Sequence, residues 1–176
     1  FLTFGSILSQ GIKSPSEFLG YEIGSRFTRH HKVVDYFMYV SNTLSNIKLE
    51  KYGETNENRP LYLAYISSQE NINNLESIRK SNLAQTGILD GNSDSKTAIV
   101  WLSYNVHGNE ASSTEASMLT IYELVTNEKA WLENTVVIMD PCINPDGRDR
   151  YVNWYNQVKN TPFNISQDAK EHHEPW

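Results

Sequence analysis

The sequence predicts an α/β fold with a mixed sheet, and three observations lead to this prediction. Residues 98–104 and 135–139 are two apolar runs with the continuous character of buried parallel strands. The segment between them has an amphipathic helical pattern, so that strand, helix and strand follow one another as in a crossover unit. Two earlier strand-like runs, 47–52 and 61–66, are joined by a polar stretch, which predicts an antiparallel pair.

The composition is that of one globular domain without a nucleic-acid partner. With 176 residues, 39% of them hydrophobic, the chain can bury a core of ordinary size. A net charge of -6 excludes the basic surface that nucleic-acid binding needs. Cys142 is the only cysteine, which excludes a disulfide framework and a zinc site made of several thiolates. No apolar run approaches the roughly 20 residues that span a bilayer, so we expect no membrane span.

The first 28 residues are expected to lead into the domain. Residues 1–10 are similar to the apolar tail and small-residue end of a signal peptide, which predicts a secreted or periplasmic protein. An ordinary N-terminal segment that packs on the domain is the alternative. We regard the chain as a fragment that is open at both ends.

Helical patterns flank the antiparallel pair. Ser14-Pro15 is typical of a helix start or turn. Residues 29–44 carry apolar side chains at helical spacing, which predicts a helix that covers the sheet. A second, surface helix around Leu75 and Ile78 ends near Gly87, before the next loop.

The crossover unit begins with the apolar run 98–104. We expect this strand to be central and buried on both faces, because nearly every position is apolar. Ser112 and Glu115 have the spacing of a capping box, which satisfies free amide groups at a helix start. The helix would bury one apolar stripe, formed by Met118, Leu119, Tyr122 and Val125.

Polar clusters follow both strands of the crossover unit, at the strand ends where α/β folds bind ligands. His107 and Glu110 lie three residues apart in the first cluster, so that one turn can aim an imidazole nitrogen and a carboxylate at the same point. Zn²⁺ accepts both ligand types. Taken alone the spacing is weak, because it arises often by chance and serves as a salt bridge or helix cap.

The two clusters together are specific. His107-Gly108-Asn109-Glu110 followed by Asn144-Pro145-Asp146-Gly147 resembles the zinc carboxypeptidase family, peptidase family M14. The hairpin around Arg59-Pro60 is also similar to that family, so the resemblance extends over approximately residues 29–156. It implies a three-layer α/β/α domain with a mixed sheet, of which residues 29–176 would form the first half.

The resemblance also implies a reaction. Enzymes of the family hydrolyse C-terminal peptide bonds with a metal-activated water, so peptide or protein C-termini would be the partners. One Zn²⁺ would be bound, with His107 and Glu110 as two of its three protein ligands. The third ligand, the general base and the Asn-Arg pair that holds the substrate carboxylate come later in the family than the Asn144 turn. We find no match for them before Trp176 and expect this chain alone to be inactive.

Other residues near the second strand end are weaker candidates. Arg148 is a candidate catalytic residue that polarises a carbonyl, and Asn144, Asp146 and Arg150 are candidates for substrate binding. The alternative is that the arginines form structural ion pairs. Asp146 would either orient His107 or serve the turn alone.

Three further features have simpler interpretations. His172 and His173 could supply a ligand, but adjacent side chains in an extended segment point apart, which favours ordinary loop residues. His30-His31 is most simply exposed to solvent. Cys142 is expected to be a small packed residue rather than a nucleophile.

Two rival functions remain open. The same fold and metal would serve the hydrolysis of an N-acyl amino acid, as in aspartoacylase-like relatives, although the turn at Asn144 favours the peptidase. A non-catalytic binding domain that keeps the fold is the second rival.

Overall fold

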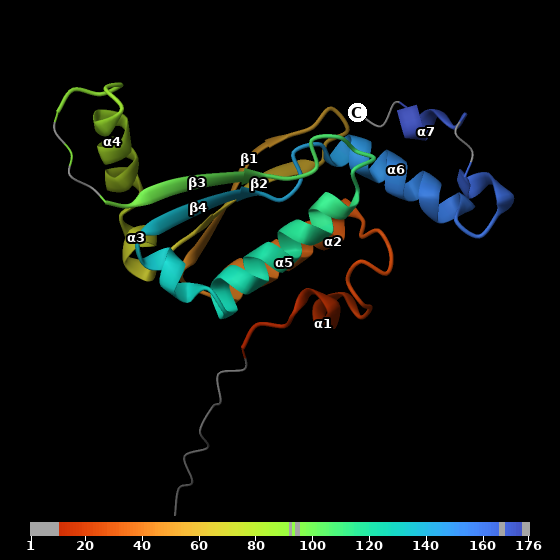
Figure 1. Cartoon of the computed structure of the whole chain (residues 1–176), viewed down its shortest axis with the longest axis horizontal. Helices are drawn as coiled ribbons and strands as arrows, with labels where there is room; N and C mark the ends of the chain where they lie inside the picture. Colours follow the sequence, from red (N-terminus) through yellow and green to blue (C-terminus); the bar gives the residue numbers. More distant parts are fainter. Residues whose placement is uncertain (1–10, 92, 94–95, 166–167, 174–176) are drawn as a thin grey trace, which may run out of the picture.

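The computed structural model describes residues 11–91, 93, 96–165 and 168–173, which form a mixed α/β fold (Figure 1). The signal-peptide prediction concerns residues 1–10 and lies outside the described residues, as does part of the loop 90–95. Within the described part, no helix is both long and apolar enough to cross a membrane.

The sheet has four strands in the order β1-β2-β4-β3. β1 and β2 are antiparallel, β2 and β4 are antiparallel, and β3 and β4 are parallel, which confirms the predicted mixed sheet and the crossover unit. The strands are β1 (Ile47–Glu54), β2 (Pro60–Ile66), β3 (Ala98–Ser103) and β4 (Thr135–Asp140).

The helices follow the predicted order, with short additions between them. The structure confirms a helix start at Ser14, where Ser14 and Glu17 form a capping box, and it confirms the two helices expected around 29–44 and 75–87. The helices are α1 (Pro15–Leu19), α2 (His30–Thr43), α3 (Gln69–Asn73), α4 (Leu75–Gln85), α5 (Ser112–Thr126), α6 (Pro145–Val158) and α7 (Lys170–His173), with 3-10 turns at Lys129–Glu133 and Pro162–Ile165.

The core lies between the sheet and one layer of helices. Figure 1 shows α2 and α5 side by side along one face of the sheet, with α1 beyond them and α4 and α6 at opposite ends. Burial of each large apolar side chain in such a core contributes about 1.5–3 kcal/mol. The two layers meet through Val33, Phe37, Val40, Met118 and Ile121 from the helices and Ala64, Ile66, Val137 and Met139 from the sheet.

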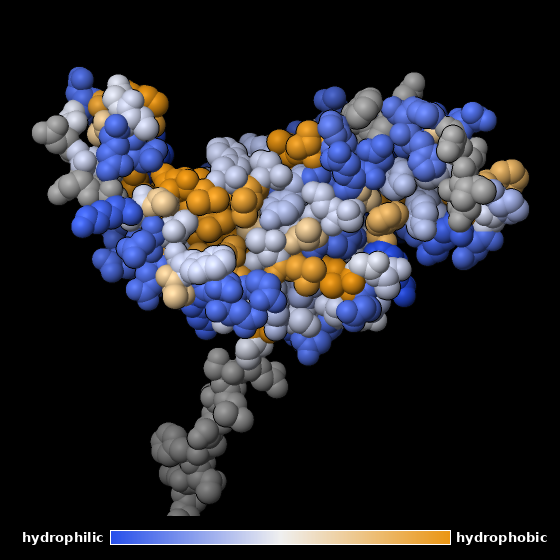
Figure 2. All heavy atoms as spheres, in the orientation of Figure 1, coloured by the Kyte–Doolittle hydropathy of each residue, from blue (hydrophilic) through white to orange (hydrophobic). Residues whose placement is uncertain are grey.

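The prediction that the strand 98–104 is central and buried on both faces is wrong for the described chain. β3 is the edge strand, and its Val100 and Trp101 are 40% and 62% exposed. Leu102 packs against the core between the sheet and the helices. Successive side chains of a strand point to opposite faces, so Trp101 lies on the other face of the sheet. Figure 2 shows apolar surface in the hollow beside α4. A continuous apolar run predicts burial but does not identify the element that covers it.

The start of α5 also differs from the prediction. Ala111 is the N-cap residue and makes no side-chain cap hydrogen bond, while Ser112 is already helical. Glu115 does not return to the helix end, because its carboxylate is buried and bonded to Arg148 and Thr28. The predicted apolar stripe is correct at Met118 and Val125, but Leu119 is exposed.

Candidate metal centre

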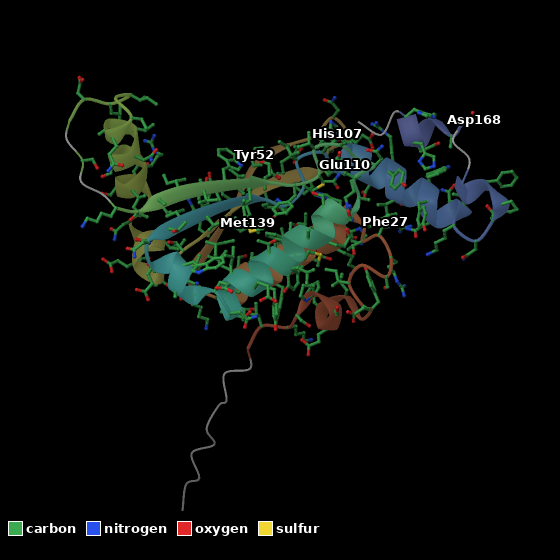
Figure 3. All side chains as sticks on the ribbon, in the orientation of Figure 1. Phe27, Tyr52, His107, Glu110, Met139 and Asp168 are labelled. Atoms are coloured by element: carbon green, nitrogen blue, oxygen red, sulfur yellow. The ribbon has the colours of Figure 1, made fainter. Side chains whose placement is uncertain are left out.

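His107 and Glu110 lie in the loop that joins β3 to α5, at the carboxyl end of the strand. The loop turns back between them, since Glu110 N donates to His107 O at 3.1 Å. Their side chains meet, with His107 Nδ1 3.1 Å from Glu110 Oε1. Both side chains are also open to solvent, at 48% and 61% exposed. Figure 3 shows them at the start of α5, near β3.

This pair suits a zinc ion in both chemistry and spacing. Zn²⁺ binds His nitrogen and carboxylate oxygen at about 2.0–2.2 Å, so two such atoms in a tetrahedral site lie roughly 3.4 Å apart. The observed 3.1 Å between Nδ1 and Oε1 is close to that spacing. In the tautomer with the proton on Nδ1, this contact is a hydrogen bond from the ring to the carboxylate. A cation would take the place of that proton.

The described residues do not complete such a site. Among them, no three His, Cys, Asp or Glu side chains are grouped so as to hold a metal ion. His172 is a candidate third ligand considered from sequence, but its ring packs edge-on against Trp154 at 4.6 Å between ring centroids. His172 lies in the short helix α7 rather than in a loop, and its carbonyl accepts from Asn109 Nδ2 at 3.2 Å. α7 is therefore attached to the loop that carries Glu110.

Asn144 supports the candidate loop from the neighbouring strand end. Its Oδ1 accepts from Gly147 N at 3.0 Å, which caps α6, and its Nδ2 donates to Val106 O at 3.1 Å. The amide thereby connects the turn after β4 to the residue that precedes His107. Substrate binding by Asn144 stays a prediction.

Arg148 lies in the core and not at the surface of the site. Its side chain is 0% exposed, and its Nη2 is 2.8 Å from Glu115 Oε1. The guanidinium also donates to the carbonyls of Thr28 and Ala111. With no exposed atom, the guanidinium offers no donor to a substrate carbonyl in this conformation, and a catalytic role for Arg148 stays a prediction. The contact with Glu115 agrees with the alternative that the arginines form structural ion pairs.

Asp146 and Arg150 make contacts with the β1–β2 turn. Asp146 Oδ1 accepts from Thr55 Oγ1 at 2.7 Å and from Arg59 Nη1 at 2.6 Å. Arg150 Nη2 donates to Glu57 Oε1 at 2.7 Å from the exposed side of α6. The hydrogen bonds of Asp146 thus serve the turn, which is the simpler of the two interpretations, and do not orient His107. Substrate binding by Asp146 and Arg150 stays a prediction.

A buried carboxyl group and a thiol lie at the end of β4. Burial raises the pKa of Asp140, while hydrogen bonds from Tyr52 Oη at 2.7 Å and from Cys142 N at 3.2 Å act in the opposite direction. Burial, with the same hydrogen bond, also raises the pKa of Tyr52. Burial raises the pKa of the Cys142 thiol to about 12, which fits the prediction of a packed residue rather than a nucleophile.

Sequence reasoning did not identify Asn105, whose side chain hydrogen-bonds to His107 O at 2.5 Å. Its place between the predicted strand and a candidate ligand was the available signal, because Asn is the residue that most readily joins Gly in a left-handed turn. The roles of Glu115 and Tyr52 have no comparable signal, since their partners Arg148 and Asp140 are 33 and 88 residues away in sequence.

Comparisons with known proteins agree with the fold and with the resemblance in sequence. A model of the zinc carboxypeptidase family, Peptidase_M14, matches residues 33–170. Carboxypeptidase A from Helicoverpa armigera superposes with a TM-score of 0.53 at 20% identity, over 69% of this chain and 25% of its own. Bovine thrombin-activatable fibrinolysis inhibitor, in complex with tick carboxypeptidase inhibitor, gives 0.51 at 15% identity, over 76% of this chain and 35% of its own.

The chain therefore spans about a quarter to a third of the length of these solved structures, and at such identities the similarity shows the fold alone. A comparison with curated protein sequences gave no match.

Proposed function

Because the chain belongs to the zinc carboxypeptidase family, we propose that it carries two zinc ligands, His107 and Glu110, of a metallocarboxypeptidase that hydrolyses C-terminal peptide bonds. The observation that supports this most directly is the 3.1 Å approach of Nδ1 and Oε1 at the carboxyl end of β3. Two exposed ligand atoms at that distance, on the side of the sheet where α/β folds bind ligands, are suited to one divalent ion.

The zinc ion would polarise the scissile carbonyl and lower the pKa of a bound water. The residues of this chain contribute the framework for that chemistry. His107 and Glu110 would hold the ion, and Asn144 fixes the backbone before His107 by donating to Val106 O. We propose that the third ligand and the general base are supplied by residues other than those described here.

Peptide or protein C-termini are the proposed substrates. Arg150 is the better candidate for contact with a substrate carboxylate, because its side chain is half exposed whereas Arg148 is fully buried. A guanidinium can bind a carboxylate through two parallel hydrogen bonds. The proposal of export from the cytoplasm rests on residues 1–10 and stays a prediction.

Zinc binding by the protein expressed from its complete reading frame tests the proposal. The variants His107→Ala and Glu110→Ala are expected to lower the zinc content of the purified protein well below one ion per chain. His31→Ala is the matched control, because His31 is an exposed histidine on α2. Unchanged zinc in both site variants would remove the basis of the proposal.

Substrate assays then separate the peptidase from its rivals. The peptidase should release C-terminal residues from peptides with a free carboxylate, and amidation of that carboxylate should abolish release. Preferential hydrolysis of N-acyl amino acids would instead identify a deacylase. Zinc binding without either activity would identify a binding domain.

A further inference from the structure

We propose that Asn105 is a positioning residue for the candidate metal centre, and that its side-chain amide holds the loop in the shape that brings His107 and Glu110 together. This inference rests on the proposed function, because it assigns a purpose to the shape of that loop. Asn105 is 2% exposed, so it would act through the backbone of His107 and not by touching substrate.

The backbone of Asn105 makes a turn that few residues tolerate. Its φ is 58°, in the left-handed region, where Asn is one of the few residues other than Gly that is commonly found. The preceding residue, Tyr104, still donates to Asp140 O at 3.0 Å in continuation of the β3–β4 pairing. The chain therefore leaves the sheet at Asn105 and turns directly into the loop with His107.

The partners of the side-chain amide fix its orientation. Arg148 Nη1 can only donate, so the atom that it contacts at 3.2 Å must be the carbonyl oxygen Oδ1. Nδ2 then faces His107 O at 2.5 Å and donates to it. With the amide reversed, both contacts would bring two like groups together.

The oxygen of the amide is anchored in the core. Besides the contact with Arg148, it accepts from Thr114 Oγ1 at 2.6 Å in the first turn of α5. Arg148 is itself held by the buried Glu115 at 2.8 Å. Asn105 thus connects the buried ion pair of Arg148 and Glu115 to the backbone carbonyl of the exposed His107.

The same arginine also binds the far end of the loop. Arg148 Nη1 donates to Ala111 O, the N-cap residue of α5, as well as to Asn105 Oδ1. The start and the end of the loop are therefore held by one guanidinium, and Asn105 Nδ2 holds its middle at His107. Fixing three points of a short loop limits the conformations available to the side chains of His107 and Glu110, which is how preorganised metal sites gain affinity.

The variant Asn105→Asp tests the donor selectively. Aspartate tolerates the same backbone conformation and keeps an acceptor for Arg148 and Thr114, but it cannot donate to His107 O. Its negative charge alone would attract a cation. A fall in zinc affinity would therefore come from the loop and not from charge.

Asn58→Asp is the matched control. Asn58 has φ 61° in the β1–β2 turn and is exposed, so the substitution makes the same chemical change at a second left-handed asparagine. The zinc dissociation constant of the protein expressed from its complete reading frame is measured by competition with a chromophoric chelator. Amide hydrogen exchange of residues 106–110 is measured in the metal-free protein.

We expect Asn105→Asp to weaken zinc binding about 10- to 100-fold and to speed exchange in the loop, with Asn58→Asp within about twofold of the parent. Asn105→Gly, which accepts the turn without strain but lacks the amide, should give the same two effects and serves if the aspartate variant does not fold. Parent-like affinity and exchange in the Asn105 variants would overturn the inference, even if His107→Ala abolishes zinc binding. If zinc binding survives in His107→Ala and Glu110→Ala, the proposed function fails, and the exchange measurement alone decides the role of Asn105.

Discussion

Asp146 Oδ1 lies 2.6 Å from Arg59 Nη1, which joins the first turn of α6 to the turn between β1 and β2. Arg59 Nε also approaches Asp149 Oδ2 at 3.1 Å, one helical turn further along α6. The guanidinium therefore binds the hairpin to the helix that follows the second strand end. None of these contacts involves His107 or Glu110.

Asp146→Ala should loosen the hairpin and leave zinc binding intact. Loss of the charged hydrogen bonds to Arg59 and Thr55 is expected to lower the free energy of unfolding by about 1–3 kcal/mol, measured by urea denaturation. In a double-mutant cycle with Arg59→Met, the coupling energy should be about 0.5–3 kcal/mol. A tenfold loss of zinc affinity in Asp146→Ala would show that Asp146 orients His107 after all.

Arg148→Met should be among the most destabilising single substitutions of the chain. It leaves the Glu115 carboxylate buried without its cation, which costs about 3–5 kcal/mol in free energy of unfolding. The double variant Arg148→Met/Glu115→Gln should recover part of that loss, because the amide still accepts from Thr28 N. Arg150→Met is the control: its exposed ion pair with Glu57 should contribute less than about 1 kcal/mol. A similar small effect for both arginines would contradict the structural role of Arg148.

The stability of the fold should depend on His30 at mildly acidic pH. His30 is buried, so the prediction that it faces solvent is wrong. Desolvation lowers the pKa of its ring below 6.5. The contact with Pro60 O and the charge of Asp149 act in the opposite direction, whereas Arg148 and Arg59 lower the pKa further. Because the folded protein binds this proton more weakly than the unfolded chain, the stabilisation is present above pH 6.5 and is lost as the pH falls through the lower folded-state pKa. Each unit of lowering corresponds to about 1.4 kcal/mol.

Urea denaturation between pH 5 and 8, in the presence of a chelator, measures this dependence. His30→Gln should flatten the pH profile below 6.5, whereas His31→Gln, at the exposed neighbouring position, should leave its slope unchanged. Equal slopes for the parent and His30→Gln would exclude His30 as the cause.

Cys142 should react with thiol reagents only after unfolding. Cys142 is 2% exposed and burial raises the pKa of its thiol to about 12, so almost no thiolate exists at neutral pH. A chromogenic disulfide reagent is expected to label less than about a tenth of the native protein in the time that it needs to label the denatured chain fully. The reason is that only an accessible thiolate reacts with the reagent. Rapid labelling of the folded protein would mean that the end of β4 opens readily.

The sequence by itself determined the local elements and the pair of candidate ligands. The spacing of apolar residues in 47–66 and 98–139 predicts the strands and the helix there. The side chains of His107 and Glu110 can meet because only one turn of the chain separates them. The order of strand, helix and strand further favoured a parallel pairing of β3 and β4, because a helix that returns the chain along the sheet starts the next strand at the same edge.

Only the tertiary structure decided which polar residues face the core. Arg148 and Arg150 are two residues apart and have the same chemistry, yet one is buried against Glu115 and the other reaches Glu57 in solvent. The rotation of α6 against α2 and α5 makes that choice, and no local pattern encodes it. The same is true of β3, where the apolar run fixed a strand but the neighbours in space fixed its place at the sheet edge. Contacts between distant segments depend on how whole elements pack, whereas periods and turns depend on neighbours in sequence.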